Sequence, residues 1–82
     1  MKIKVKFFAS LRERIGQSEI SQEIEEGITI EDLWAKLQRE FPNLASVKMT
    51  LLCAVNQNYV ESKYILQDND EVVFIPPVSG GN

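Results

Sequence analysis

Residues 29–41 form the one long amphipathic segment of this 82-residue chain, and they limit the folds available to it. Apolar side chains recur at helical spacing and form one stripe, made of Ile30, Leu33, Trp34, Leu37 and Phe41. Thr29 followed by Asp32 is typical of a capping box, and Pro42 is expected to end the helix. A single apolar stripe needs an opposing apolar surface, so the rest of the chain must supply one. Trp34 is expected in that core rather than in a ligand site.

The segments on either side of this helix have the alternation of β-strands. The predicted strands are residues 2–8, 18–25, 51–56, 59–60 and 71–75. A short helix is expected at residues 9–15, with Gly16 as its C-terminal stop. One helix on one face of a mixed sheet is the economical packing for this order of elements. If the first and last strands pair in the middle of the sheet, the fold is an α+β β-grasp, as in ubiquitin.

The composition fits one ordinary soluble domain, covering residues 1–75, and excludes several classes of function. The net charge is −3 without a basic block, which argues against nucleic acid and membranes as partners. The chain has no histidine, so Ser-His and Cys-His mechanisms and histidine metal sites are excluded. A single cysteine, no signal-like start and no long apolar run predict a cytosolic protein.

No convincing catalytic site can be found in the body of the chain. Cys53 lies between Leu52 and Ala54 in an apolar strand, with nothing nearby to lower its pKa, so we expect an inert core thiol. Asp68 and Asp70 lack the rest of a calcium motif and are expected to serve a turn. We therefore expect no metal and no cofactor bound by this chain.

The C-terminal segment, residues 76–82, is predicted to be a slim extended tail. Two consecutive prolines stop the last strand, and seven residues could reach roughly 20 Å. Gly80 and Gly81 have no side chains, so their backbone can thread a narrow channel. A frayed end is the plain alternative. If the chain takes part in chemistry, its terminal carboxylate is the expected reactive group. ATP would activate it as an acyl-adenylate, and a sulfur, amine or alcohol nucleophile would displace AMP.

Several segments together resemble a known family. They are VKFFA (5–9), LRE (11–13) with Gly16, LLCAVNQ (51–57), DNDEV (68–72) and FIPPVSGG (74–81). With these segments the chain resembles the small subunit of molybdopterin synthase, the ubiquitin-like sulfur-carrier family called MoaD. The likeness covers nearly the whole chain, and its most specific parts are the AVNQ strand, the aspartate turn and the PPVSGG tail.

The resemblance implies a carrier that works with two partners. An E1-like adenylyltransferase (MoeB-like) would consume ATP to adenylate Gly81, which is then converted to a thiocarboxylate, while Gly80 provides clearance. The large synthase subunit (MoaE-like) would receive the tail, and sulfur would pass to cyclic pyranopterin monophosphate to form molybdopterin. The partner-binding residues implied in this way are Phe8, Tyr59, Ile75, Pro76, Pro77, Val78 and Ser79. Alternation along the strands independently points Phe8 and Ile75 outward.

One residue departs from the family pattern. The family normally ends at Gly-Gly, whereas this chain continues to Asn82. The carbonyl of Gly81 is then held in a peptide bond. We therefore expect that the 82-residue form cannot be thiocarboxylated on Gly81 until Asn82 is removed.

Three other functions are compatible with the same sequence. A sulfur carrier of the thiamine pathway would share the fold and the tail chemistry. A ubiquitin-like protein modifier would form isopeptide bonds to lysine. A plain β-grasp interaction module would have an inert tail, and deleting residues 80–82 would then change nothing.

Overall fold

The computed structural model of the chain describes residues 1–47 and 52–76. Its elements in chain order are β1 (Lys2–Phe7), α1 (Ala9–Ile15), β2 (Glu19–Glu23), α2 (Ile30–Glu40), the 3-10 helix η1 (Pro42–Leu44), β3 (Leu52–Val55), β4 (Asn58–Tyr59) and β5 (Glu71–Ile75). All the strands and both α-helices predicted from the sequence are present, with bounds that differ by a residue or two.

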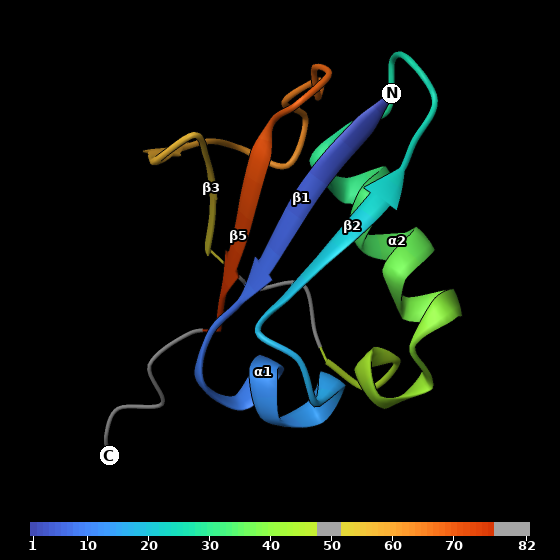
Figure 1. Ribbon diagram of the computed structural model, residues 1–82, viewed down its shortest axis with the longest axis vertical. Coiled ribbons are helices and arrows are strands. Elements are labelled where there is room, and N and C mark those ends of the chain that lie inside the picture. The colour runs from blue at the N-terminus through green and yellow to red at the C-terminus, as the bar shows by residue number, and fades with distance from the viewer. Residues whose placement is uncertain (48–51, 77–82) are drawn as a thin grey trace.

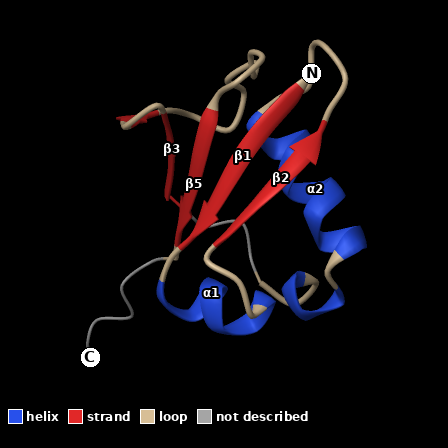
Figure 2. Cartoon of the chain, in the orientation of Figure 1, coloured by secondary structure: helices blue, strands red, loops and turns tan. Residues whose placement is uncertain are grey.

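The strands form one five-stranded sheet in the order β2-β1-β5-β3-β4. The first and last strands, β1 and β5, run parallel at its centre, with Val5 beside Val72. β2 and β3 flank this pair, each antiparallel to its neighbour. Figure 1 shows α2 passing behind the β2 side of the sheet and α1 at one end of the strands. Figure 2 shows the strands as a single layer. This mixed sheet with one main helix on one face confirms the predicted β-grasp fold.

The core lies between the sheet and α2. The central strands contribute alternate side chains, among them Val5, Val72 and Phe74, all with no exposed surface. The apolar stripe of α2 meets them, and the rings of Trp34 and Phe74 lie with their centroids 4.9 Å apart. Trp34 is 1% exposed, so its assignment to the core is confirmed.

Local sequence determines where α2 begins. The Thr29 side chain accepts a hydrogen bond from the backbone N–H of Asp32 at 3.2 Å. In return, the Asp32 carboxylate accepts one from the backbone N–H of Thr29 at 3.1 Å. These bonds satisfy two donors that a helix start leaves free, so the predicted capping box is confirmed. Pro42 opens η1 after α2 has ended.

β3 is well covered, as its continuous apolar run predicts, except at its first residue. Cys53, Ala54 and Val55 are buried, whereas Leu52 is 53% exposed. The register explains the difference. Cys53 pairs with Phe74 on the helix side, so Leu52 and its partner Ile75 lie on the other face of the sheet. No described helix covers that second face, so the large side chain of Leu52 stays accessible there, while the small Ala54 is buried among its neighbours.

Candidate functional site

The face of the sheet opposite α2 carries a group of accessible apolar side chains, which we call the open-face patch. Its members are Phe8, Leu52, Tyr59, Val73 and Ile75. Leu52 pairs with Ile75, and Ala54 pairs with both Val73 and Tyr59. These cross-strand pairs place β3, β4 and β5 side chains on one surface. Leu52 and Tyr59 are 53% and 71% exposed, which is unusual for large apolar and aromatic residues that lie together.

Phe8 reaches this patch because it continues β1 by one residue. Phe7 pairs with Phe74 in the parallel register, so the next residue, Phe8, comes level with Ile75. Alternation sends Phe7 into the core at 1% exposure and leaves Phe8 50% exposed. The chain then turns at Ala9, whose φ of 52° lies in the left-handed region. The outward directions predicted for Phe8 and Ile75 are consistent with this register.

A tight turn between β3 and β4 holds Tyr59 at the edge of the patch. Asn56 and Gln57 both have positive φ, at 52° and 74°. The Asn56 side chain accepts a hydrogen bond from the backbone N–H of Glu71 at 3.0 Å and donates one to the Asp70 carboxylate at 2.8 Å. The turn is thereby fixed to the start of β5, so Tyr59 is presented by a rigid element.

Asp68 and Asp70 serve turns, as predicted. Asp70 is 5% exposed, and its carboxylate accepts hydrogen bonds from the backbone N–H of Gln67 and from the Asn56 side chain, both at 2.8 Å. Asp68 accepts a hydrogen bond from the backbone N–H of Lys2 at 2.9 Å. Within residues 1–47 and 52–76, no cluster of three or more histidine, cysteine or acidic side chains is arranged to hold a metal ion.

Cys53 is buried in the core and is unsuited to nucleophilic chemistry. Burial raises the pKa of its thiol from 9.0 to about 12. The thiolate is the reactive form of cysteine, so the thiol stays protonated and unreactive at neutral pH. The prediction of an inert thiol agrees with this environment.

The open-face patch leads directly to the start of the tail. Ile75 ends β5, and the half-buried Pro76 follows it. The other tail residues singled out above lie outside the described residues, so their roles stay predictions; they are Pro77, Val78, Ser79, Gly80 and Gly81. Asn82 also lies outside them. The structure therefore places Phe8, Tyr59 and Ile75 on one face of the sheet and leaves the tail chemistry open.

Sequence reasoning missed two members of the patch, Leu52 and Val73, as site residues. Alternation along residues 71–75 points Val73 away from the core, but it does not show which residues lie beside it. The signal was the pairing of β3 with β5, which places Leu52 opposite Ile75 and puts Val73 between Lys6 and Ala54. Only the register reveals that these residues share one surface.

Charged side chains lie beside the patch on the open face. Lys6 and Glu71 form an ion pair with Nζ and Oε2 3.1 Å apart, and Lys4 lies 3.7 Å from Glu19. Such exposed pairs add little to stability, with a typical contribution of about 0–1 kcal/mol. They give the apolar patch a polar rim, which is the usual anatomy of a protein-binding surface.

Among residues 1–47 and 52–76, neither α-helix has the length and the apolar character that a membrane-spanning helix requires.

Comparison with known proteins assigns the chain to a family. Its sequence matches the ThiS family over residues 5–81. The chain belongs to the ThiS family. A relative from Chlamydomonas reinhardtii, the molybdopterin synthase sulfur carrier subunit, is 46% identical over 99% of this chain and 100% of its own length. The resemblance stated from the sequence motifs is thereby confirmed for this ThiS-family chain.

Two solved structures support the fold of this ThiS-family chain. SAMP1 from Haloferax volcanii superimposes with a TM-score of 0.86 at 24% identity, covering 99% of this chain and 100% of that one. A complex of subunits 1 and 2 of the molybdopterin-converting factor from Helicobacter pylori contains a chain with a TM-score of 0.69 at 22% identity, covering 99% and 100% of the two chains. At these identities the likeness concerns the fold alone.

Proposed function

We propose that the chain is the sulfur-carrier subunit of a molybdopterin synthase. The observation that carries this proposal is the open-face patch, which ends at the root of a Pro-Pro-Val-Ser-Gly-Gly tail. A carrier needs a rigid surface that its partners bind and a slim terminus that can enter their active sites. The relative that is 46% identical over the full chain is named for this role.

The reactive group in this proposal is the carboxylate of Gly81 in a chain that ends there. Attack of a carboxylate oxygen on the α-phosphate of ATP forms an acyl-adenylate and releases pyrophosphate. Hydrosulfide then displaces AMP at the carbonyl carbon, and a thiocarboxylate results. Two such thiocarboxylates in turn supply the two sulfur atoms that convert cyclic pyranopterin monophosphate to molybdopterin, and in each transfer water supplies the oxygen that regenerates the carboxylate. Gly80 and Gly81 suit this role because a backbone without side chains can enter a narrow active site.

The body of the chain contributes binding rather than catalysis. Its single thiol is buried with a pKa raised to about 12, so this chain would not carry sulfur as a cysteine persulfide. ATP is then consumed by an E1-like adenylyltransferase, and the carrier itself binds no cofactor. The large aromatic and aliphatic side chains of Phe8, Leu52 and Tyr59 are of the kind that anchor protein interfaces.

Two partners would use the carrier in turn. An adenylyltransferase would activate the tail, and a large synthase subunit would accept the sulfur from it. One terminus cannot occupy two active sites at once, so the two complexes must exclude each other. The relative from Chlamydomonas reinhardtii is named as a subunit of molybdopterin synthase, and this supports a synthase of more than one subunit for the present chain.

The test starts from a semisynthetic chain ending at Gly81 as a thiocarboxylate, because this form needs no activating enzyme. Mixed with a large synthase subunit and cyclic pyranopterin monophosphate, it should produce molybdopterin, detected as its fluorescent oxidation product. The matched control is the same chain ending in an ordinary carboxylate, which should produce none. A thiocarboxylate form that binds the large subunit yet yields no molybdopterin would contradict the proposal.

The rival functions predict different products from the activated chain. A thiamine-pathway carrier would supply sulfur to thiazole formation and leave the pyranopterin unchanged. A protein modifier would be found joined to lysine side chains of other proteins when an adenylyltransferase and ATP are added to a cell extract.

A further inference from the structure

Strand β2 is a free edge of the sheet. It pairs with β1 on one side, and no described strand pairs with its other side. The backbone groups of Met1 and Ile24 bond each other, and the N–H of Phe7 donates to the carbonyl of Ser18. In an antiparallel pair such residues alternate with residues whose backbone groups point away from the partner strand. Therefore the N–H and C=O groups of β2's alternate residues face the open edge: Glu19, Ser21 and Glu23.

These three edge residues have no other hydrogen-bond partners for their backbone groups among the described residues. Their side chains are exposed and lie on the face of the sheet opposite α2. A peptide that adds to this edge would therefore find unpaired backbone groups and, beside them, exposed carboxylates. An edge with unpaired backbone groups is a ready template for another strand.

Strand β1 shows which chemistry fits beside β2. Lysine stands at every second position of β1, and the register places Lys2 beside Glu23 and Lys6 beside Glu19. An ion pair also joins Lys4 to Glu19, with Nζ and Oε2 3.7 Å apart. The side chains of Glu19 and Glu23 both lie on the face of the sheet opposite α2, next to the open edge. A strand added at that edge with basic side chains at alternate positions would pair its charges with these glutamates, as the lysines of β1 do on the other side of β2.

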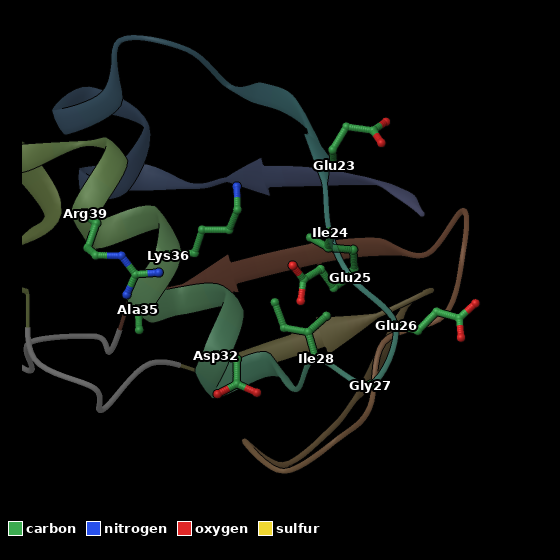
Figure 3. Close-up of a pocket in the computed structure, with 10 residues that line it drawn as sticks. All are labelled: Glu23, Ile24, Glu25, Glu26, Gly27, Ile28, Asp32, Ala35, Lys36 and Arg39. Carbon is green, nitrogen blue, oxygen red and sulfur yellow. The ribbon is translucent and has the colours of Figure 1, made fainter.

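A hollow of about 660 Å³ lies where the edge meets α2. Figure 3 shows Ile24 and Ile28 on the segment that leaves β2, and Ala35 on α2; all three line the hollow. Acidic side chains border the hollow on the strand and loop side, and the basic Lys36 and Arg39 border it on α2. The aliphatic floor can receive the alternate, inward-facing side chains of an added strand.

A second copy of this chain fits the edge poorly. Antiparallel pairing of β2 with another β2 would bring Glu19 of one copy opposite Glu23 of the other. Like charges directly opposite each other destabilise a sheet, and the whole chain already carries a net charge of −3. The edge therefore disfavours self-association and favours a basic partner.

We propose that the β2 edge binds an extended segment of a partner protein, with lysine or arginine at alternate positions and small aliphatic residues between them. The segment extends the sheet by one strand and places its aliphatic side chains in the hollow against Ile24, Ile28 and Ala35. β1 separates β2 from β5, so this site and the open-face patch can be occupied together. The proposal does not depend on the sulfur-carrier function.

The test uses a capped Lys-Val-Lys-Val-Lys peptide titrated into the isotope-labelled chain, with amide spectra and amide hydrogen exchange as readouts. We expect shifts confined to β2, the loop at residues 24–28 and α2. We also expect new exchange protection of the amides of Glu19, Ser21 and Glu23. The same peptide with N-methyl groups on its edge-facing amides should bind at least about tenfold more weakly, because the strand hydrogen bonds are lost.

Two variants test the role of the edge itself. The double change Glu19→Lys and Glu23→Lys should weaken peptide binding at least about tenfold, because it replaces attraction by repulsion. Ser21→Pro should do the same by removing an edge-facing N–H, and unchanged β1 and β5 amide signals would show that it still folds. Leu52→Asp on the open-face patch is the matched control and should leave peptide binding unchanged.

Three outcomes would overturn the proposal. In the first, the N-methylated peptide binds equally well. In the second, the peptide binds but does not protect the edge amides from hydrogen exchange, which would mean that charge attraction alone holds it and no strand is added. In the third, no binding occurs at millimolar peptide, which would mean that the glutamates only keep the edge from self-associating.

Discussion

The two faces of strand β5 carry similar side chains for different purposes. Val72 and Phe74 point toward α2 and have no exposed surface, whereas Val73 and Ile75 lie on the open face and are only half-buried. All four residues are apolar, so composition alone cannot distinguish them. The helix-side residues are needed to form the core. The open-face residues stabilise the fold less, and their apolar character is better explained by a partner that covers them.

The neighbours Phe7 and Phe8 repeat this contrast within β1. Phe7 is 1% exposed and packs in the core, whereas Phe8 is 50% exposed and reaches the open-face patch. The left-handed Ala9 follows at once and turns the chain into α1. Folding and binding are thus divided between adjacent residues. Substitutions on the two faces should therefore affect different measurements.

The largest effect on stability is expected from Phe74→Ala. The substitution empties space against Trp34 in the centre of the core, and such truncations cost about 3–5 kcal/mol of unfolding free energy. Urea unfolding followed by tryptophan fluorescence measures this loss. Ile75→Ala is the control on the other face of the same strand and should cost much less. Equal losses for the two variants would show that both faces are packed alike.

Leu52→Ala should have the opposite profile. We expect the unfolding free energy to change by no more than about 0.5 kcal/mol, because half of this side chain is already in water. Its affinity for the large synthase subunit should fall about tenfold or more, which corresponds to about 1.4 kcal/mol. Calorimetry with that subunit measures the loss. Unchanged affinity, with Tyr59→Ala also unchanged, would rule out the patch as the docking surface.

Thr29→Ala should lower stability by about 1 kcal/mol, since it removes the side chain that caps the start of α2. Thermal or urea unfolding detects this change, and Thr29→Ser should retain most of the stability because it keeps the hydroxyl. Binding to the large subunit should not change, because the cap supports the helix-covered side only. A loss of affinity in the folded variant would show that the two faces are coupled.

The smallest effect, a gain of up to about 1 kcal/mol, is expected from Ala9→Gly. Glycine adopts a φ near 52° without the steric cost that alanine has there, although it loses more entropy on folding. Gly16→Ala is the counterpart, because Gly16 has a φ of 84° and closes α1, so this change should destabilise. Comparison of the two unfolding midpoints decides the sign. A loss of stability in Ala9→Gly would mean that the turn is not strained.

Much of the fold could be predicted from the sequence because its signals are local. The capping box at Thr29, the stripe along α2 and the stop at Gly16 each depend on residues a few positions apart, and each was confirmed. The alternation along β1 and β5 likewise indicated which side chains face the core.

The open-face patch could be predicted only in part, because it depends on pairing between distant strands. Alternation indicated an outward Phe8, but only the register of β3 with β5 shows that Leu52 lies beside Ile75. A continuous apolar run such as 51–56 does not reveal which of its faces is covered. The free edge of β2 was not foreseen for the same reason, since strand order is a property of the whole chain.

The most direct test of the sulfur-carrier function is the intact mass of the protein purified from its native cells, together with the mass of its C-terminal peptide. A sulfur carrier should end at Gly81, with part of the population heavier by one exchange of oxygen for sulfur. Adding the adenylyltransferase, ATP and a sulfur donor should increase that fraction. A population that ends uniformly at Asn82, and stays unmodified with all three present, would contradict the proposed function and leave the fold unaffected.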